Sequence, residues 1–420
     1  MQGVNGHPAK QSKPHPALTG IECRAPKSGP DSALVGAART LLLASLVVAA
    51  LGSSCHRQSA PTLKIENVSN NPSFSDRPCI ACTRDGHVAL AWSDYATGHE
   101  EVWLVEKDKG GVWSNPYNLS KAGNINGSRS VSLCYGRDGT LHAAWSQFAV
   151  RGQSGAWTIV YTRRLSGGDW AVPETIWHGT AVAPHIGVDT SGTVHLEFED
   201  MNYGHSTICY SNRARAGAWA NVQEISTSFA AAGGSGGLGV YDDGSAVVAW
   251  EKDEGPSDFG TILWSERTAT GAWSSPTPFD FPAHFCSGPE IACNGSALAL
   301  AFGASGSGIW LVVMTRNERG GWSAYDTTCA TRNPGGRSVG LDKDGHVIAV
   351  WANNVDGQLR IGRRDSAWAQ LLIADSLFPN ISSVAVDADG HVDMAWSSEA
   401  YFEAPTDIYY IELEASDFPK

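Results

Sequence analysis

The sequence is poor in charged residues, which make up 17% of its 420 positions, and bases are the scarcer sign. Its 30 Lys and Arg face 43 Asp and Glu, which gives a formal net charge of −13 at pH 7. This acidic balance disfavours nucleic acid and anionic lipid as the main partners, because both would repel it. Apolar runs are also short. The run at residues 41–51 falls well below the roughly 20 residues that cross a bilayer as a helix.

Metal-binding patterns are missing as well: Cys79 and Cys82 form a C-x-x-C pair, but no second pair or histidine cluster completes a zinc site. The pair lies on an expected strand, where residues three apart point to opposite faces, so a redox motif is disfavoured. Asp-x-Asp-Gly at residues 342–345 and 387–390 lacks the distal glutamate of a calcium loop and favours a hairpin turn. We therefore expect no metal and no cofactor. Seven cysteines follow Cys55, so at least one should be free unless it pairs between molecules.

The front of the chain is typical of an export signal and a disordered leader. Residues 1–40 are rich in Pro, Gly, Ser and Ala, and Arg39, the apolar run and the sequence GSSC at residues 52–55 follow. A basic segment, a short apolar stretch and small residues mark an exported protein. The small residues before Cys55 resemble the lipobox of bacterial lipoproteins. This resemblance implies that Cys55 is lipidated and anchors the protein in the cell envelope, at the outer membrane or surface. Plain secretion and a transmembrane anchor are the alternatives.

A turn-and-strand motif recurs seven times and organises the rest of the chain. Its first copy is DGHVALAW at residues 85–92, and the glycine of the turn recurs at intervals of 45 to 53 residues. The glycines are Gly86, Gly139, Gly192, Gly244, Gly295, Gly345 and Gly390. A period of about 50 residues, with a turn, a strand and an aromatic in each copy, indicates an array of β-modules that share one core.

Each unit predicts four short strands, as in a propeller blade. Two strands flank the Asp-Gly turn, the third ends in a base, and a turn with a second Trp leads to the fourth. The last unit ends at residues 407–414 without a fourth strand, and residues 62–69 have the pattern of the missing piece. We therefore predict an all-β, seven-bladed propeller closed by its N-terminal strand, with six or eight blades as alternatives. The expected divisions are leader 1–54, tether 55–61, propeller 62–414 and C-terminal tail 415–420.

Most aromatic and basic residues of the repeat have structural explanations. The tryptophans that end the second strand should form core between blades: Trp92, Trp145, Trp250, Trp351 and Trp396. The second tryptophan of each hairpin should also be structural: Trp113, Trp170, Trp219, Trp273, Trp322 and Trp368. The bases that end the third strand should stack on these rings or face water: Lys107, Arg164, Arg213, Arg267, Arg316 and Arg364.

The hairpin before the second tryptophan resembles the Asp-box of sialidase-like (BNR-repeat) propellers. RTATGAWSSP at residues 267–276 keeps the Gly, the Trp and the Pro three residues later, as do residues 163–173 and 107–116. The resemblance implies a propeller over about residues 62–414. True sialidases add an arginine triad on the substrate carboxylate, a Tyr nucleophile assisted by Glu, and an Asp acid/base. Here Arg77 directly precedes Pro78, so the first arginine motif is not met and Arg77 carries over only weakly.

Candidate ligand-binding residues concentrate at one end of the propeller, around the channel mouth. Segments that enter first strands supply Arg77, Arg129, His185, Glu290 and Arg337. Segments between second and third strands supply Asp94, Asp200 and Tyr401, with Glu199, Glu251 and Asp253 nearby. The three arginines would hold a carboxylate or sulfate by forked hydrogen bonds, and nearby carboxylates would act as acid and base. The alternative is a scatter of polar rim residues.

The first strand of the fourth unit is rich in glycine: residues 231–241 read AAGGSGGLGVY, with five glycines. Glycine in a strand interior often marks close approach of a ligand or of another backbone. We expect blade four to leave the roomiest part of the channel wall, against which a ligand would lean. A loosely packed inner strand is the alternative.

Three classes of function remain open. The first is a lipid-anchored propeller that binds a glycan or protein ligand at the loops around the channel. The second is a sialidase-like glycoside hydrolase, and the third is a structural envelope scaffold. The unmet arginine motif and the absence of a clear Tyr/Glu pair favour binding, and no catalytic residue is assigned. We expect an exported monomer of the bacterial cell envelope, or a secreted one, with no nucleic-acid partner and no membrane contact besides the lipid.

Overall fold

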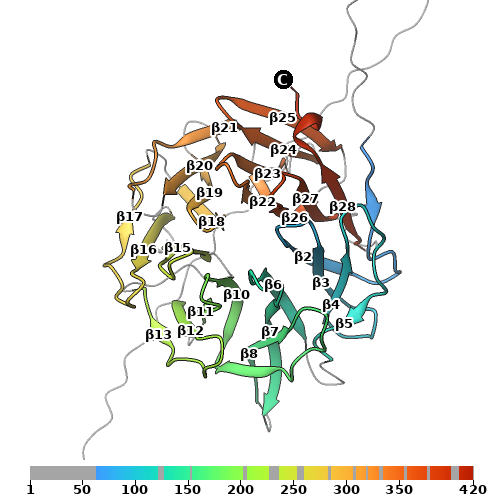
Figure 1. Cartoon of the computed structure of the whole chain (residues 1–420), viewed down its shortest axis with the longest axis vertical. Helices are drawn as coiled ribbons and strands as arrows, with labels where there is room; N and C mark the ends of the chain where they lie inside the picture. Colours follow the sequence, from blue (N-terminus) through green and yellow to red (C-terminus); the bar gives the residue numbers. More distant parts are fainter. Residues whose placement is uncertain are drawn as a thin grey trace, which may run out of the picture. The chain divides into compact units, whose positions relative to one another are not determined.

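The computed structural model describes thirteen stretches of the chain: residues 63–121, 127–151, 154–201, 206–226, 236–252, 260–281, 285–305, 309–317, 320–330, 334–353, 357–375, 379–398 and 406–419. They form a ring of seven four-stranded antiparallel sheets (Figure 1). The prediction of an all-β, seven-bladed propeller is therefore confirmed. No helix in this part of the chain is long and apolar enough to cross a membrane.

Each blade starts with its innermost strand and continues outward along the sequence (Figure 1). Blade one contains β2 (Ser75–Cys82), β3 (Val88–Asp94), β4 (Glu101–Lys107) and β5 (Tyr117–Asn118). Blade two contains β6 (Ser128–Tyr135), β7 (Leu141–Arg151), β8 (Ser154–Arg164) and β9 (Glu174–His178). Blade three contains β10 (Ala181–Val188), β11 (Val194–Asp200), β12 (Thr207–Arg213) and β13 (Gln223–Glu224).

The remaining four blades repeat this arrangement. Blade four contains β14 (Gly236–Val240), β15 (Ala246–Lys252), β16 (Thr261–Arg267) and β17 (Thr277–Pro278). Blade five contains β18 (Phe285–Cys293), β19 (Ala297–Ser305), β20 (Ile309–Asn317) and β21 (Asp326–Ala330). Blade six contains β22 (Pro334–Leu341), β23 (Val347–Asn353), β24 (Gln358–Arg364) and β25 (Trp368–Ala374). Blade seven contains β26 (Pro379–Val386), β27 (Val392–Ser398), β28 (Ile408–Leu413) and, outermost, β1 (Glu66–Asn67).

The two ends of the propeller chain meet in blade seven. Strand β1 pairs antiparallel with β28, with Glu66 opposite Tyr410. Beside this pairing, Ser69 Oγ donates to Asp407 at 3.1 Å and accepts the Ile408 N–H at 2.9 Å. The predicted closure is confirmed, and it covers an edge that would otherwise be open to pairing with another chain.

The repeated turns and tryptophans have the predicted structural roles. All seven turn glycines have φ between 76° and 95°, a region that other residues rarely adopt. The tryptophans that end the second strands are 0–1% exposed. Across the seam between blades seven and one, Trp113 packs edge-on to Tyr410 with ring centroids 4.9 Å apart, and Lys107 Nζ lies 4.1 Å from the Tyr410 centroid. Similar base-on-ring contacts involve Arg164, Arg213, Arg267 and Arg316.

The cysteines described are free thiols: Cys79, Cys82, Cys134, Cys209, Cys286 and Cys293. Burial raises the pKa of Cys79 to about 11 and that of Cys134 to about 12. Thiols with such pKa values are poor nucleophiles, which agrees with the absence of a redox motif. At the other end of the chain, Phe418 is 5% exposed and packs in the core of blades six and seven.

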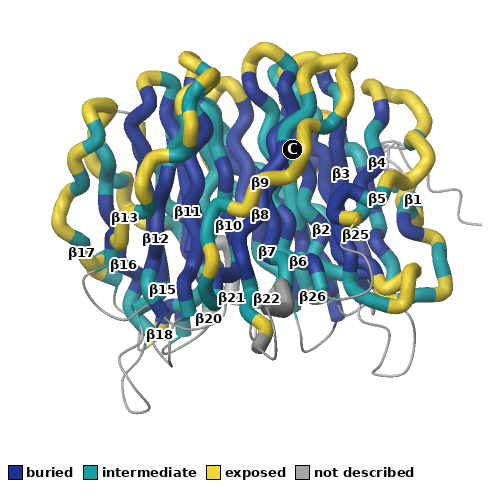
Figure 2. The backbone as a smooth tube through the Cα atoms, turned by 90° about the horizontal axis from the view of Figure 1, so that it is seen from below, coloured by how far each residue is buried: buried dark blue, intermediate teal, exposed yellow. Residues whose placement is uncertain are grey.

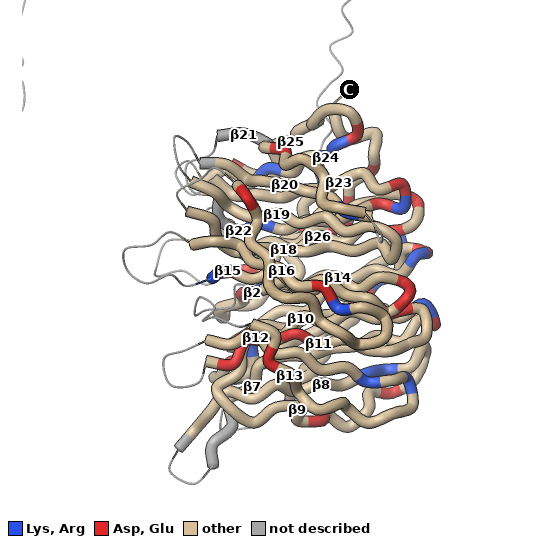
Figure 3. The backbone as a smooth tube through the Cα atoms, turned by 90° about the vertical axis from the view of Figure 1, so that its left-hand side faces the viewer, with Lys and Arg blue, Asp and Glu red and all other residues tan. Residues whose placement is uncertain are grey.

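The ends of the strands define two faces. The turn face carries the Asp-Gly turns and the hairpins with the second Trp, and the loop face carries the connections between second and third strands. From the side, the strands are buried along their length and exposed residues gather along one rim (Figure 2). The positions of charged residues are frequent along the right-hand rim in Figure 3, and others lie toward the opposite rim.

Candidate functional site

The inner strands carry a β-bulge close to the loop face. In blade one the register shifts between Asp76 and Cys79, and similar shifts occur in blades two, three, five, six and seven. Five bulge residues have left-handed φ of 50–56°: Arg77, Ser130, Ala183, Gly288 and Gly336. A left-handed conformation costs a residue other than glycine roughly 1–2 kcal/mol. Strain of this kind persists where the surroundings enforce it, and it clusters at functional sites.

Adjacent blades hold these bulges in place. The Ala183 N–H donates to Ser146 Oγ of the preceding blade at 3.1 Å. A second contact recurs two residues after the bulge. There, a side chain of one blade accepts a hydrogen bond from a backbone N–H of the next blade. The acceptor and donor pairs are Cys79 with Leu133, Ser132 with Ile186, Ser338 with Val384, and Ser383 with Ile80. The backbone around the channel mouth is therefore fixed before any ligand arrives.

Arg77 and Arg129 share one neighbourhood at the seam between blades one and two. Arg77 Nη1 donates to Ser130 Oγ of blade two at 3.2 Å, and the Arg77 side chain is 42% exposed. Burial, the larger effect, raises the pKa of Glu100, and Arg129 and Arg77 both act in the opposite direction. The carboxyl of Glu100 thus lies within the field of both guanidinium groups.

Aromatic rings border these two arginines. The Arg129 guanidinium lies 4.1 Å from the centroid of Trp157. On the side of blade one, Phe74 and Tyr95 pack edge-on at 6.0 Å and are 45% and 43% exposed. Exposed rings beside fixed cations combine apolar faces with forked hydrogen-bond donors. We call this group the arginine–aromatic patch: Phe74, Arg77, Tyr95, Glu100, Arg129 and Trp157.

Arg337 and Glu290 lie at a different seam, between blades five and six. The Arg337 guanidinium packs against the α-carbon of Gly288. Burial raises the pKa of Glu290 to about 7, although Arg337 acts to lower it. The structure therefore places Arg337 with Glu290, and it places Arg77 with Arg129.

His185 lies on the inner strand of blade three, where it pairs in register with Glu197. Burial lowers the pKa of His185 to about 4. Glu197 is 1% exposed, and within the described part of the chain its Oε2 has no hydrogen-bond partner. Burial raises its pKa well above the usual range, and Glu199 and Glu290 add to this. Glu197 was not predicted from the sequence. An alignment of the repeats would have revealed it, because the equivalent residues are all apolar: Ala91, Ala144, Ala249, Ala301, Val350 and Ala395.

The expectation of a roomy channel wall at blade four was wrong for the glycines described. A Cβ on Gly237 would lie 3.2 Å from backbone atoms of Pro289 and Ile291 in blade five. On the other side, the Glu197 carboxylate of blade three packs against Gly236. These glycines allow close approach of neighbouring blades, so they serve packing. Residues 231–235 lie outside the described residues.

Asp94 and Asp200 are engaged inside their blades. Asp94 is 1% exposed, and it accepts hydrogen bonds from Ser73 and Ser75 at 2.6 and 2.7 Å and from Trp92 Nε1 at 2.8 Å. Asp200 is 9% exposed and accepts the Trp177 Nε1–H at 3.1 Å. Asp94 therefore organises the loop that enters the first strand. Tyr401 and Cys55 lie outside the described residues.

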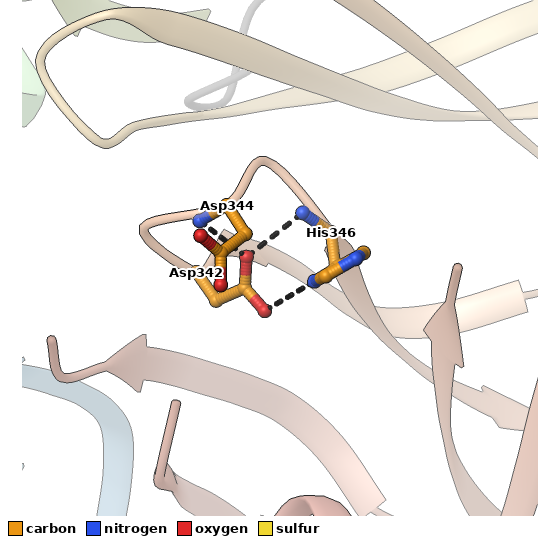
Figure 4. A group of neighbouring side chains, drawn as sticks. All are labelled: Asp342, Asp344 and His346. Carbon is orange, nitrogen blue, oxygen red and sulfur yellow. Dashed lines mark hydrogen bonds and ion pairs between the residues drawn. The ribbon is translucent and has the colours of Figure 1, made fainter. Parts of the chain in front are cut away.

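Two Asp-x-Asp-Gly-His turns on the turn face bring potential metal ligands together. In the first, Asp342 accepts the N–H groups of Asp344 and His346 at 2.9 Å and bonds His346 Nδ1 at 2.7 Å (Figure 4). In the turn at residues 387–391, Lys109 Nζ lies 3.1 and 3.0 Å from the two carboxylates. The carboxylates thus serve turn geometry and an ammonium group of the protein itself, as the hairpin interpretation expects.

No protein-family model and no curated protein matches the chain. Among solved structures it is similar to a protein of unknown function from Dyadobacter fermentans, with a TM-score of 0.51, 11% identity, and coverage of 83% of this chain and 99% of that one. It is also similar to the BP39L lectin from Burkholderia pseudomallei, with a TM-score of 0.56, 16% identity, and coverage of 80% and 98%. A GH93 α-L-arabinofuranosidase of Fusarium graminearum has a TM-score of 0.45, 13% identity, and coverage of 69% and 94%. The first two likenesses concern the fold alone.

Proposed function

We propose that this protein binds an acidic saccharide at its loop face, through the arginine–aromatic patch. The observation that carries the proposal is the placement of Arg77 and Arg129 beside exposed aromatic rings. Guanidinium groups bind carboxylate or sulfate through two parallel hydrogen bonds, and the rings supply apolar contact for the body of a sugar. A lectin among the structures of the same fold supports a carbohydrate-binding role.

The rigid backbone under the patch also supports binding. Arg77 occupies a strained bulge, with φ of 56°, and its guanidinium is bonded to the next blade. The ring of Trp157 holds the guanidinium of Arg129. Groups held in place before binding lose little conformational entropy when the ligand arrives, which improves affinity.

Calorimetric titration with paired acidic and neutral oligosaccharides tests this function. Arg77→Gly and Arg129→Ala should each weaken binding of the acidic member at least tenfold, because each removes a forked cation. Ala183→Gly is the matched control, since it changes an equivalent bulge in blade three without removing charge. Equal affinity for neutral and acidic sugars, or unchanged affinity in both arginine variants, would contradict the proposal.

A sialidase-like glycoside hydrolase is the second candidate, and Glu290 favours it. A carboxyl with a pKa of about 7 is suited to donate a proton at neutral pH. Turnover of a fluorogenic sialoside and a panel of aryl glycosides, lost in Glu290→Gln, would support catalysis. No turnover by the intact protein would leave binding as the function.

We also propose export and lipidation at Cys55, supported by the apolar run and the small residues that precede it. Labelled fatty acid should enter the intact protein in a bacterial host and should be absent from Cys55→Ser. Equal labelling of the two proteins would exclude Cys55 as the lipid site.

A further inference from the structure

An ion pair recurs at three of the seams between blades, on the side of the turn face. The base comes from the end of the third strand of one blade. The glutamate comes from the third strand of the preceding blade, close to the end of that strand. The pairs are Lys107 with Glu412 at 3.2 Å, Arg316 with Glu266 at 2.7 Å, and Arg164 with Glu106. In each pair at least one side chain is mostly buried, and the two charges neutralise each other at these three seams.

Blade two reverses the sign at this position. Its residue equivalent to Glu106 is Arg163, because Arg163 immediately precedes the final base of its strand, Arg164. The base of blade three, Arg213, therefore has no glutamate to meet at this position. It pairs with Glu174 on the outer strand of blade two at 2.7 Å, as Arg364 pairs with Asp326 on the outer strand of blade five at 2.6 Å. Two arginines therefore lie at this seam, whereas each of the three seams above holds one acid and one base.

A pocket of about 270 Å³ lies at this seam on the turn face. Its wall includes Arg163, Arg137, Arg215, Asp138 and His142, together with the turn of blade three around Asp189. The walls come from both blades, so the pocket spans the altered seam. It lies at the end of the strands opposite the arginine–aromatic patch, since Arg163 ends β8 and Trp157 lies near its start.

The charges in the pocket wall leave Arg163 without a carboxylate. Arg215 pairs with Asp138 at 2.6 Å, and Arg137 pairs with Asp242 of blade four. Arg163 Nη1 donates to the backbone oxygen of Arg215 at 2.9 Å, and within the described residues no carboxylate lies within ion-pair distance of Arg163. The other arginine at this repeat position, Arg363, differs because it meets Asp342 and Asp365, both at 3.2 Å.

His142 adds a neutral polar group to the wall. It is 4% exposed, and its Nδ1 bonds the hydroxyl of Tyr161 at 2.7 Å. Burial lowers the pKa of His142 to about 4, although Asp138 acts to raise it, and the nearby Arg163 and Arg213 lower it further. At neutral pH the imidazole is therefore uncharged and offers a hydrogen bond without competing for an anion.

We propose that this pocket binds a small oxyanion (a carboxylate, sulfate or phosphate group), whose negative charge takes the place of the glutamate found at three other seams. Arg163 is the principal cation, and Arg215 and Arg137 form the rim. A guanidinium group matches all three oxyanions with parallel hydrogen bonds. The site is independent of the saccharide site proposed above, because it uses different residues at the opposite ends of the strands.

Titration of the full-length protein with inorganic phosphate, inorganic sulfate and glucuronate tests the site, with chloride holding ionic strength constant. Calorimetry should show saturable binding of at least one anion, and thermal unfolding should shift upward as that anion saturates the protein. The three anions separate phosphate, sulfate and carboxylate as the preferred group.

Arg163→Glu is the informative variant, because it introduces the glutamate that three other blades carry at this position. It should weaken anion binding at least tenfold and raise the Tm in the absence of anion, since Arg213 regains its seam partner. Arg163→Gln should lose the binding without that gain in Tm. Arg77→Gly should bind the anion as the parent does, which separates this site from the saccharide site. No saturable binding of any of the three anions, or unchanged binding in both Arg163 variants, would overturn the proposal.

Discussion

The seam between blades one and two and the seam between blades two and three are built from the same repeat, but the charge at one repeat position is reversed, from Glu106 to Arg163. In the first, Glu106 accepts from Arg164 and from the Tyr135 hydroxyl at 3.0 Å. Burial acts to raise the pKa of Glu106, but its partners, His87 and Arg164 foremost, lower it to about 2. In the second seam, Arg163 occupies the same repeat position, and a pocket lies where the compact acid–base network would be.

The difference shows how a repeat protein separates stability from function. A repeated contact is sufficiently explained by packing, because every blade needs it to pair with its neighbour. A residue that departs from its own repeat, with no compensating partner, requires another explanation. Glu197 is a departure of this kind, and Arg163 differs from its equivalent Arg363 because no described carboxylate lies within ion-pair distance of it.

The largest expected effect comes from removing the strand that closes the ring in blade seven. Deletion of residues 56–70 removes β1 and leaves β28 as an open edge in blade seven. We expect a severe loss of soluble protein that unfolds cooperatively, measured by yield and thermal denaturation. Deletion of residues 1–54 is the control and should leave the melting of the propeller unchanged. Equal melting of the two truncated proteins would show that closure does not stabilise the ring.

Glu106→Arg would give the first seam the charge of the second. It leaves Arg164 facing a like charge and removes the acceptor of the Tyr135 hydroxyl. We expect a loss of about 3–5 kcal/mol in the free energy of unfolding, as when one partner of a buried pair is removed. Urea denaturation measures this loss. Glu174→Arg, which changes a partly exposed acid, should lower the free energy of unfolding by less. A loss below about 1 kcal/mol would show that the seam ion pair contributes little.

A third seam sharpens the comparison through pH. The pKa of Glu290 rises from 4.5 to about 7 on folding, so the folded chain binds this proton more tightly. The stabilisation that this proton gives is fully present below pH 4.5 and is lost as the pH rises through 7. Since one pKa unit corresponds to 1.36 kcal/mol, the free energy of unfolding should fall by at most about 3 kcal/mol. Glu290→Gln should lack this loss. His142 and His185 have lowered pKa values and lose stability toward acid in both proteins, so they cancel in the difference. Parallel stability curves between pH 5 and 8 would contradict this assignment.

The smallest expected effect concerns the bulges rather than the seams. Ala183→Gly relieves a left-handed φ of 50° but increases the entropy of the unfolded chain. We expect a net gain within about 1 kcal/mol, measured by thermal denaturation. A clear loss would show that the methyl group contributes packing that exceeds the strain.

Much of the fold and little of the candidate site could be predicted from the sequence. The Asp-Gly turns, the recurring tryptophans and the displaced fourth strand follow from local turn geometry and periodicity, which act over a few residues. Arg77 and Arg129 were found because they occupy similar positions in the repeat. The partners Glu100 and Trp157 were not found, because Glu100 lies in the loop before β4 and Trp157 lies near the start of the long strand β8, where no repeat pattern marks them.

The sequence by itself determined the number of blades, the closure of the ring and the buried side chains, because these depend on short-range patterns repeated seven times. Only the tertiary structure decided which charges meet. Arg337 lies with Glu290, Arg77 lies with Arg129, the glycines of blade four are needed for close packing, and Arg163 lacks the carboxylates that Arg363 meets at the same repeat position. Such encounters join residues some 50 positions apart across a seam between blades, and their outcome depends on side-chain burial and competition among several partners.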